Sequence, residues 1–291
     1  MGGLSVVLAV RQAIRCAFLA AVALVLAEAA SGPASAQGKL EARYTASLAG
    51  IPLGEGSWVI DIGDTQYNAA ASGNTTGLLQ AFTGGHGTTA VRGVFNGGKP
   101  ASSVYAATIY TRKKYDEIRL TTANGNVKDN KIDPPLDDNP ERVPVTEAHQ
   151  HGVLDPMTAT ILRVPGNGDP MAPESCQRSL AVFDGRIRYD LRLAFKRMDK
   201  VKAEKGYAGP VLVCSVQFSP VSGYVPSRYA MKYLAAQHDM EVWLAPIAGT
   251  RVLVPFRAQG PTPVGQAVLV ATQFVSVATP AKAVANGAKT Q

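Results

Sequence analysis

The sequence has few of the residues that catalytic sites require. It contains four histidines and three cysteines in 291 residues. It has no Cys-x-x-Cys pair, no Gly-x-Ser-x-Gly turn around a serine nucleophile and no Asp-x-Asp-x-Asp-Gly calcium loop. His238 lies beside Asp239 without an activated serine, and the glycines around His86 are not followed by the lysine of a phosphate-binding loop. We therefore expect no catalytic residue, no cofactor and no metal ion, and a protein that is not an enzyme.

His149 and His151 form the one histidine cluster of the sequence. On a strand, their spacing would point both imidazoles to one face, where Asp155, or Asp137 and Asp138, could supply a third metal ligand. No fixed spacing requires this arrangement. We therefore interpret both histidines as exposed loop residues.

Long apolar runs are also absent after the N-terminus. Two arginines precede the apolar residues 16–26, and the small residues Ala34-Ser35-Ala36 precede Gln37. This order is typical of a secretory signal peptide, and the apolar stretch is well short of the roughly 20 residues of a membrane-spanning helix. We expect cleavage of residues 1–36 between Ala36 and Gln37, and a periplasmic protein that is not membrane-spanning and not lipidated.

The chain is basic, with a formal net charge of +7. A basic surface could attract anionic phospholipid, peptidoglycan or lipopolysaccharide, although we favour a role in solubility because most of the charges are scattered. Export and the lack of aromatic stacking platforms beside the basic segment, residues 186–205, argue against nucleic acid as a partner. The oligomeric state is not indicated by the sequence.

Apolar and polar residues alternate along most of the remaining chain, which predicts β-strands. Turn signals such as Asn96-Gly97-Gly98 and Asn124-Gly125 separate them. We expect a single β-rich domain over residues 37–277, mainly antiparallel, with the form of an open barrel or β-spiral carrying one or two short helices; a β-sandwich is the alternative. The predicted strands are Leu40 to Leu48, Gly56 to Ile62, Gln66 to Ser72, Thr88 to Phe95, Ala101 to Tyr110, Asp116 to Thr122, Gly209 to Phe218, Glu241 to Leu244, Arg251 to Arg257 and Gly265 to Val277.

A further hairpin is predicted between Leu180 and Leu193. Asp184-Gly185 is a preferred centre of a two-residue turn, which sets Phe183 opposite Arg186. This register places the apolar side chains of the second strand on one face and its polar side chains on the other. Arg186, Arg188 and Arg192 then form a positive stripe, a candidate surface for an anionic ligand, although we favour a solvated sheet face.

Two segments have helical signals and two resist regular structure. Asp155 to Val164 begins with an N-cap and a proline, and Ser227 to His238 has apolar residues at helical spacing. The proline-rich, acidic residues 132–146 predict an extended loop, and the Ala- and Lys-rich residues 278–291 predict a disordered tail.

Cys176 and Cys214 are the cysteines that follow the predicted leader. Two thiols in an exported domain usually form a disulfide, and closure of this loop of about 38 residues would stabilise the fold by about 4 kcal/mol. In a simple meander, two strands separate the cysteines too widely for a bond. Cys176 should therefore lie in the segment that precedes its strand and cross an end of the sheet towards Cys214, unless the third strand pairs elsewhere.

Several short motifs resemble the bacterial envelope family called domain of unknown function 3108. They are Tyr44-Thr-Ala-Ser-Leu-Ala-Gly50-Ile-Pro-Leu-Gly54, Val153-Leu-Asp-Pro-Met-Thr-Ala159, Phe183-Asp-Gly185, Val242-Trp-Leu244 and the pair Cys176 and Cys214. The resemblance covers nearly the whole mature chain. It implies an exported, β-rich protein of Gram-negative bacteria without an established enzymatic activity, and it supplies no catalytic residues. A more distant similarity in plan is to periplasmic β-spiral proteins linked to envelope integrity.

These observations predict a non-enzymatic periplasmic protein that supports the cell envelope or binds a lipid, a glycan or another envelope protein. A curled sheet offers an apolar concavity for such a ligand. The alternatives are a hydrolase that acts on envelope polymers and a structural scaffold with a filled interior. The sequence does not distinguish a pocket from a packed core, because the same alternating residues line both.

Overall fold

Strands make up most of the described residues in the computed structural model, which describes residues 37–77, 80 and 84–279. All of these residues belong to one compact unit. The predicted signal peptide lies outside the described residues, as does the predicted tail apart from Ala278 and Thr279. No helix among the described residues is long and apolar enough to cross a membrane.

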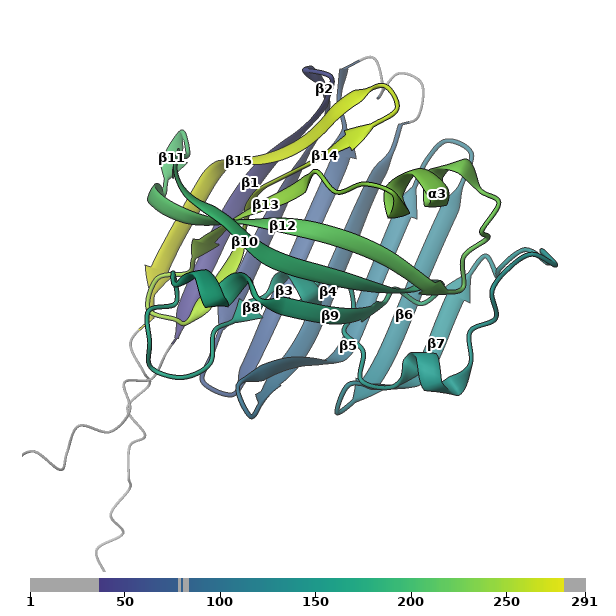
Figure 1. Cartoon of the computed structure of the whole chain (residues 1–291), viewed down its shortest axis with the longest axis horizontal. Helices are drawn as coiled ribbons and strands as arrows, with labels where there is room; N and C mark the ends of the chain where they lie inside the picture. Colours follow the sequence, from purple (N-terminus) through teal and green to yellow (C-terminus); the bar gives the residue numbers. More distant parts are fainter. Residues whose placement is uncertain (1–36, 78–79, 81–83, 280–291) are drawn as a thin grey trace, which may run out of the picture. The chain divides into compact units, whose positions relative to one another are not determined.

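The strands form a single 15-stranded sheet that does not close (Figure 1). Its order is β7-β6-β5-β4-β3-β2-β1-β15-β14-β13-β12-β10-β9, with β8 beside β14 and β11 beside β15. The N-terminal half consists of β1 (Gly38–Leu48), β2 (Ile51–Ile62), β3 (Gln66–Thr75), β4 (His86–Asn96), β5 (Lys99–Tyr110), β6 (Tyr115–Ala123) and β7 (Asn126–Asp133). The C-terminal half consists of β8 (Leu162–Arg163), β9 (Arg178–Phe183), β10 (Arg188–Lys202), β11 (Lys205–Gly206), β12 (Ala208–Ser222), β13 (Met240–Pro246), β14 (Val252–Thr262) and β15 (Gly265–Ala278).

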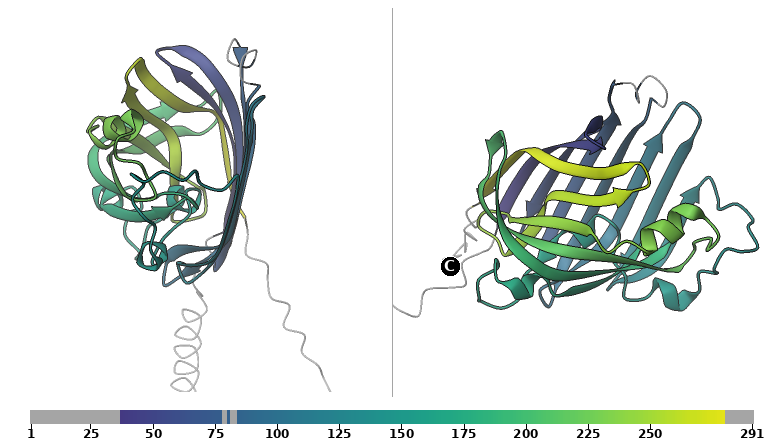
Figure 2. Two further views of the ribbon diagram at one scale, coloured as in Figure 1. Left: turned by 90° about the vertical axis from the view of Figure 1, so that its right-hand side faces the viewer. Right: turned by 45° about the horizontal axis from the view of Figure 1, so that its top comes forward.

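The two halves are continuous through the antiparallel pairing of β1 with β15, from Gly38 opposite Ala278 to Leu48 opposite Ala267. Beyond this seam, the C-terminal half curls over one face of the N-terminal half (Figure 2). The prediction of a mainly antiparallel open barrel is therefore confirmed. The alternative of a β-sandwich is wrong, because one hydrogen-bonded sheet forms both layers.

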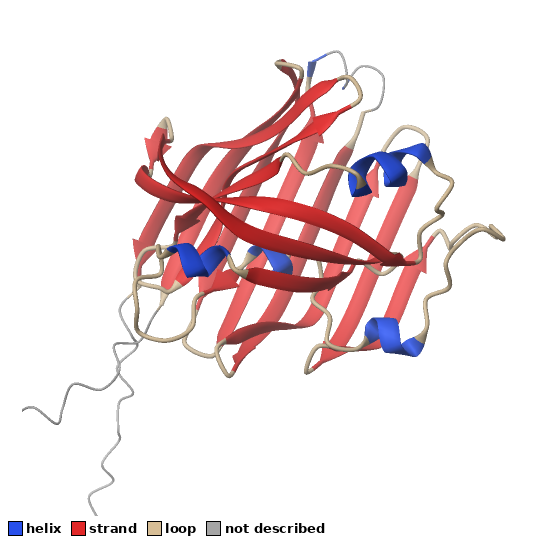
Figure 3. Cartoon of the chain, viewed as in Figure 1, coloured by secondary structure: helices blue, strands red, loops and turns tan. Residues whose placement is uncertain are grey.

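Few helices accompany the strands (Figure 3). The helical elements that lie wholly within the described ranges are the 3-10 turns η2 (Glu147–Gln150), η3 (Thr158–Thr160) and η4 (Pro173–Cys176), and the α-helix α3 (Tyr229–Ala235). The helix predicted over Ser227 to His238 is confirmed in a shorter form. Residues 134–146 contain no helix or strand, as predicted for the acidic loop, whereas Ile132 and Asp133, the first two residues of the predicted loop, belong to β7.

The helix predicted over Asp155 to Val164 is wrong. Asp155 does begin a helical turn, since its Oδ1 accepts the backbone N–H groups of Met157 at 3.0 Å and Thr158 at 2.9 Å. The turn ends at Thr160, and Leu162 and Arg163 then pair with β14 as β8. Hydrogen bonding to a neighbouring strand replaces the helical bonds of the second turn.

The predicted register of the β9–β10 hairpin is also wrong, by two residues. Phe183 lies opposite Arg188, so residues 184–187 form a four-residue turn. Asp184 stabilises this longer turn, because its Oδ1 accepts the N–H groups of Arg186 at 2.8 Å and Ile187 at 2.7 Å. A shift of two residues keeps each side chain on its predicted face.

The main core lies between the two halves of the sheet. The inner segment, residues 153–163, crosses this space and buries Val153, Met157 and Ile161 against both halves. Tyr67 of β3 fixes its position, with its hydroxyl 2.8 Å from the Thr158 hydroxyl. A second core cluster, around Cys176 and Cys214, packs the C-terminal half against residues 162–176.

Candidate functional site

The inner segment leaves part of the interior unfilled. Small residues of the N-terminal half line this space, among them Gly56 and Ala71. The result is a pocket of about 360 Å³ between the two halves, which opens to solvent and which we call the interior pocket. It is lined by Tyr44, Gly56, Ser57, Trp58, Ala71, Ser72, Thr89, Tyr105, Pro156, Met157, Thr160, Pro255 and Leu269. This volume falls in the range of natural ligand-binding pockets.

Three parts of the chain build the walls of the interior pocket. Aromatic side chains come from the N-terminal half, Met157 from the inner segment, and Leu269 from the C-terminal half. The Tyr44 hydroxyl donates to the Pro255 carbonyl oxygen at 2.7 Å and so joins the two halves beside the pocket. The side chains that line the pocket therefore meet only in the folded chain.

Trp58 and Thr89 are lining side chains with a buried donor that has no hydrogen-bond partner among the described residues. Trp58 is 8% exposed, and its donor is the indole Nε1. A buried donor without a partner costs about 1–3 kcal/mol. A ligand recovers that free energy only if it displaces the atoms that cover this N–H and presents an acceptor to it.

A polar cluster lies behind the interior pocket and consists of Asp155, Asp184, Tyr105 and Tyr189. Burial raises the pKa of the Asp155 carboxyl above its ordinary value, and hydrogen bonds from Thr158 oppose this shift. Burial likewise raises the pKa of Asp184. It also raises the pKa of Tyr105 to about 12, and the pKa of Tyr189 still further with a contribution from both carboxylates. Burial thus favours the neutral form of each of these four side chains.

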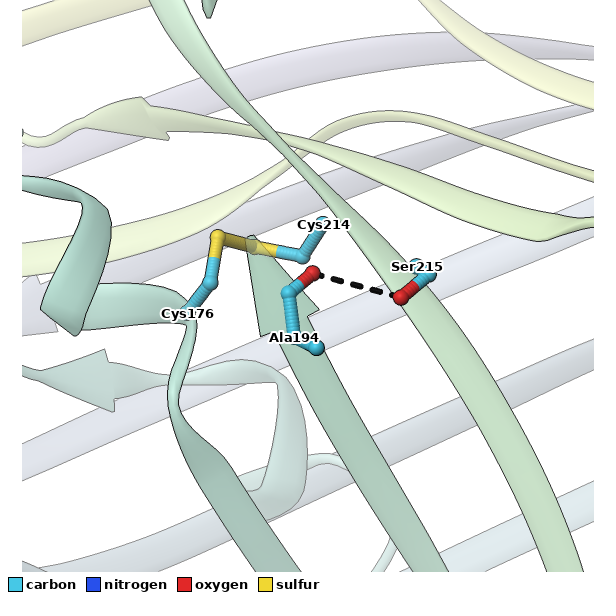
Figure 4. The surroundings of a disulfide bond; sticks show 4 residues. All are labelled: Cys176, Ala194, Cys214 and Ser215. Carbon is cyan, nitrogen blue, oxygen red and sulfur yellow. Dashed lines mark hydrogen bonds between the residues drawn. A yellow bond between two sulfur atoms is a disulfide. The ribbon is translucent and has the colours of Figure 1, made fainter. Parts of the chain in front are cut away.

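The disulfide between Cys176 and Cys214 occupies the predicted position. Cys176 ends η4, before β9, and bonds to Cys214 of β12 across β10, with a Cα–Cα distance of 5.7 Å (Figure 4). Beside it, the Ser215 hydroxyl donates to the Ala194 carbonyl oxygen of β10 at 3.3 Å. Both cysteines are fully buried.

The predicted arginine stripe is only partly open to solvent. Arg186 lies in the β9–β10 turn, where its guanidinium is 2.5 Å from the Asp116 carboxylate. Arg188 pairs with Asp190 at 2.8 Å, whereas Arg192 is exposed. Binding of an anionic ligand by these three arginines remains a prediction.

The histidines do not converge on a site. His149 lies in η2, not on a strand, and its Nδ1 accepts the Thr146 N–H at 3.1 Å. His151 lies 3.6 Å from the Glu147 carboxylate, and His238 is exposed. Within the described ranges, no group of three or more histidine, cysteine or acidic side chains could hold a metal ion.

Sequence reasoning foresaw an apolar concavity but not the residues that form it. The signal that could have indicated the pocket is the presence of small residues, such as Gly56 and Ala71, at inward-facing positions of successive strands. Trp58 and Met157 are distant in the sequence, so no local pattern joins them.

Comparisons with known proteins find a family match and similar solved structures. The sequence matches the family of proteins of unknown function DUF3108 over residues 43–272, whereas a comparison with curated proteins finds no match. Among solved structures, the chain is similar to a β-barrel-like DUF1849 protein from Brucella abortus, with a TM-score of 0.44 and 10% identity over 84% of this chain and 99% of that chain. It is also similar to a DUF1329 family protein from Desulfovibrio piger, with a TM-score of 0.20 and 9% identity over 83% of this chain and 85% of that chain. Since the family match runs from β1 to β15, the chain belongs to the DUF3108 family.

Proposed function

We propose that the protein binds an apolar or amphipathic molecule in the interior pocket, as a non-enzymatic binding protein of the periplasm. The observation that carries this proposal is the pocket itself, with aromatic and aliphatic walls and the unpartnered Trp58 N–H. Among the described residues that line it, none is a carboxylate, histidine or thiol, which favours binding over hydrolysis.

The volume of the pocket limits the size of the ligand. A water molecule occupies about 30 Å³ of liquid, so a pocket of about 360 Å³ holds roughly a dozen groups of that size. This corresponds to one acyl chain or a small ring system. The ligand should carry one hydrogen-bond acceptor, such as a carbonyl or ester oxygen, placed to accept from Trp58.

Native mass spectrometry of the protein purified from periplasmic extract tests the proposal. We expect a bound molecule of low mass that is released by organic solvent. Protein that carries no such molecule, and that binds no fluorescent fatty acid in solution, would contradict the proposal and favour a structural scaffold.

Filling the interior pocket should abolish binding without loss of stability. Ala71→Leu adds apolar atoms where Ala71 faces the pocket, and we expect the affinity for a fluorescent fatty acid to fall at least tenfold. Ala70→Leu is the matched control, because the neighbouring side chain is exposed on the opposite face of β3. Equal affinities for the two variants would show that the ligand binds elsewhere.

Trp58 should report the ligand directly. The chain has two tryptophans, and the Nε1 of the other, Trp243, donates to Asp199 at 2.9 Å. In a Trp243→Phe variant, Trp58 is the only fluorophore of its kind, and we expect its emission to shift to shorter wavelength when a ligand displaces water from the pocket. Adding Trp58→Phe should weaken binding about tenfold, because the ligand loses a buried donor. An emission spectrum that does not change at saturating ligand would exclude the pocket as the site.

A further inference from the structure

Several turns lie together at one end of the sheet. Hydrogen-bond register links them, since Asn74 pairs with His86, His86 with Tyr110, and Tyr110 with Tyr115. The β1–β2 and β14–β15 turns are also neighbours, because the Ala49 N–H donates to the Gln266 carbonyl oxygen. Figures 1 and 2 show these turns along the same edge. We call this edge, formed by residues 49–51, 110–115 and 263–264, the turn edge.

Large apolar side chains project from the turn edge. Ile51, the first residue of β2, is 65% exposed, and Val264, in the β14–β15 turn, is 69% exposed. Tyr110 and Tyr115 are also exposed and pack together, with ring centroids 5.0 Å apart. Isoleucine and valine at loop tips favour insertion into an apolar phase, and tyrosines are typical of the boundary between membrane and water.

The β5–β6 turn adds three consecutive cations, Arg112, Lys113 and Lys114. All three are exposed, and none makes a salt bridge with a described residue. The acidic residues that follow are already paired, Asp116 with Arg186 and Glu117 with Arg119. The positive charge of this turn is therefore not compensated locally.

We propose that the turn edge docks on an anionic phospholipid surface. The cations match the charge of the headgroups, and the tyrosines and the two aliphatic tips match the layer beneath them. The same edge leads to the interior pocket: Gly56 and Leu269 line the pocket five and four residues from Ile51 and Gly265, which is roughly 15 Å along their strands. Docking goes beyond the proposed binding of a ligand and would bring the pocket close to a source of lipid.

Sedimentation with vesicles tests this proposal. We expect the protein to bind vesicles that contain phosphatidylglycerol and to remain in solution with vesicles of phosphatidylcholine alone. Added salt should weaken binding, because it screens the attraction between cations and headgroups. Equal binding to both kinds of vesicle, or binding to neither, would overturn the proposal.

Substitutions identify the edge that binds. Removing the three cations with R112A, K113A and K114A should weaken vesicle binding about a hundredfold, at about 1 kcal/mol for each cation. The matched control is K200A, K202A and K205A, which removes the same charge from exposed positions on β10 and β11. Similar losses for both variants would indicate attraction to the whole basic protein and would contradict docking by the turn edge.

The double variant Ile51→Ser and Val264→Ser separates the insertion of apolar side chains into the membrane from the attraction of the cations to the headgroups. We expect this variant to bind vesicles about tenfold more weakly, with its dependence on salt unchanged. Hydrogen exchange provides a second readout, because amides of residues 111–114 should be slowed by vesicles in the native protein. Ala71→Leu, which blocks the interior pocket, should bind vesicles normally, so failure of ligand binding and failure of docking are distinguishable.

Discussion

Replacing both Cys176 and Cys214 with alanine is expected to lower the free energy of unfolding by about 4 kcal/mol. The disulfide closes a loop of 38 residues, and without it the unfolded chain gains the conformational entropy of that loop. Alanine is preferred to serine because both positions are fully buried and a hydroxyl would need a hydrogen-bond partner. Urea denaturation followed by far-ultraviolet circular dichroism measures the change.

Chemical reduction provides the control for this prediction. A reducing agent should destabilise the native protein by a similar amount and leave the double-alanine variant unaffected. Two results would contradict the prediction: a double-alanine variant that the reducing agent destabilises, or a variant whose free energy of unfolding is less than about 1 kcal/mol below that of the native protein. Either would show that the disulfide does not restrain the unfolded chain as the loop length requires.

Asp155→Ala is expected to destabilise the fold by about 3 kcal/mol. The Asp155 carboxylate is 1% exposed and accepts two backbone N–H groups, those of Met157 and Thr158. Alanine leaves both amides buried without an acceptor, at about 1–3 kcal/mol each. Asp155→Asn is the matched control, since its amide oxygen can accept the same two bonds, and it should cost less than about 1 kcal/mol. Equal losses for alanine and asparagine would contradict this role of the oxygen.

The native protein and the Asp155→Asn variant should differ in how their free energy of unfolding depends on pH. Burial raises the pKa of Asp155, so the folded state holds this proton at pH values where the unfolded chain has released it. The native protein therefore loses stability as pH rises from the unfolded pKa of about 3.9 through the higher folded pKa, and Asp155→Asn removes this loss. We expect the stability of Asp155→Asn relative to the native protein to increase over that window.

Asp199 supplies a control of opposite sign. The hydrogen bond from Trp243 lowers the pKa of Asp199, so its contribution is present above the unfolded pKa and is lost as pH falls through the folded pKa. Asp199→Asn should therefore become less stable than the native protein as pH rises. Thermal melts between pH 3 and 8 would contradict the argument for Asp155 if the two variants changed in the same direction.

The strands could be predicted from the sequence because each has one buried face. In β1, for example, Leu40, Ala42 and Tyr44 alternate with polar residues and all three are buried. The position of Cys176 before its strand was one of the two arrangements that strand spacing allowed. Local pattern was sufficient for the strands, and simple geometry narrowed the choice for the disulfide.

The features that were not predicted depend on side chains acting on the backbone or on distant contacts. Asp184 selects a four-residue turn by accepting two amides, so the Asp-Gly signal for a two-residue turn was misleading. The second turn of the predicted helix after Asp155 is replaced by pairing with β14, far along the chain. The interior pocket depends on how the C-terminal half curls, and periodicity carries no information about that curvature.

The seam between β1 and β15 determines when the sheet can be completed. Among the described strands, β1 is the first and β15 the last, so residues near Gly38 must wait for residues near Ala278 to be synthesised. Pairings between distant residues form slowly, because the entropy of closing the chain is lost before the contacts form. Until β15 arrives, one edge of β1 lacks its partner strand, and an unpaired edge can join a second chain. A chain that emerges N-terminus first is therefore most prone to aggregate just before its last strand is available.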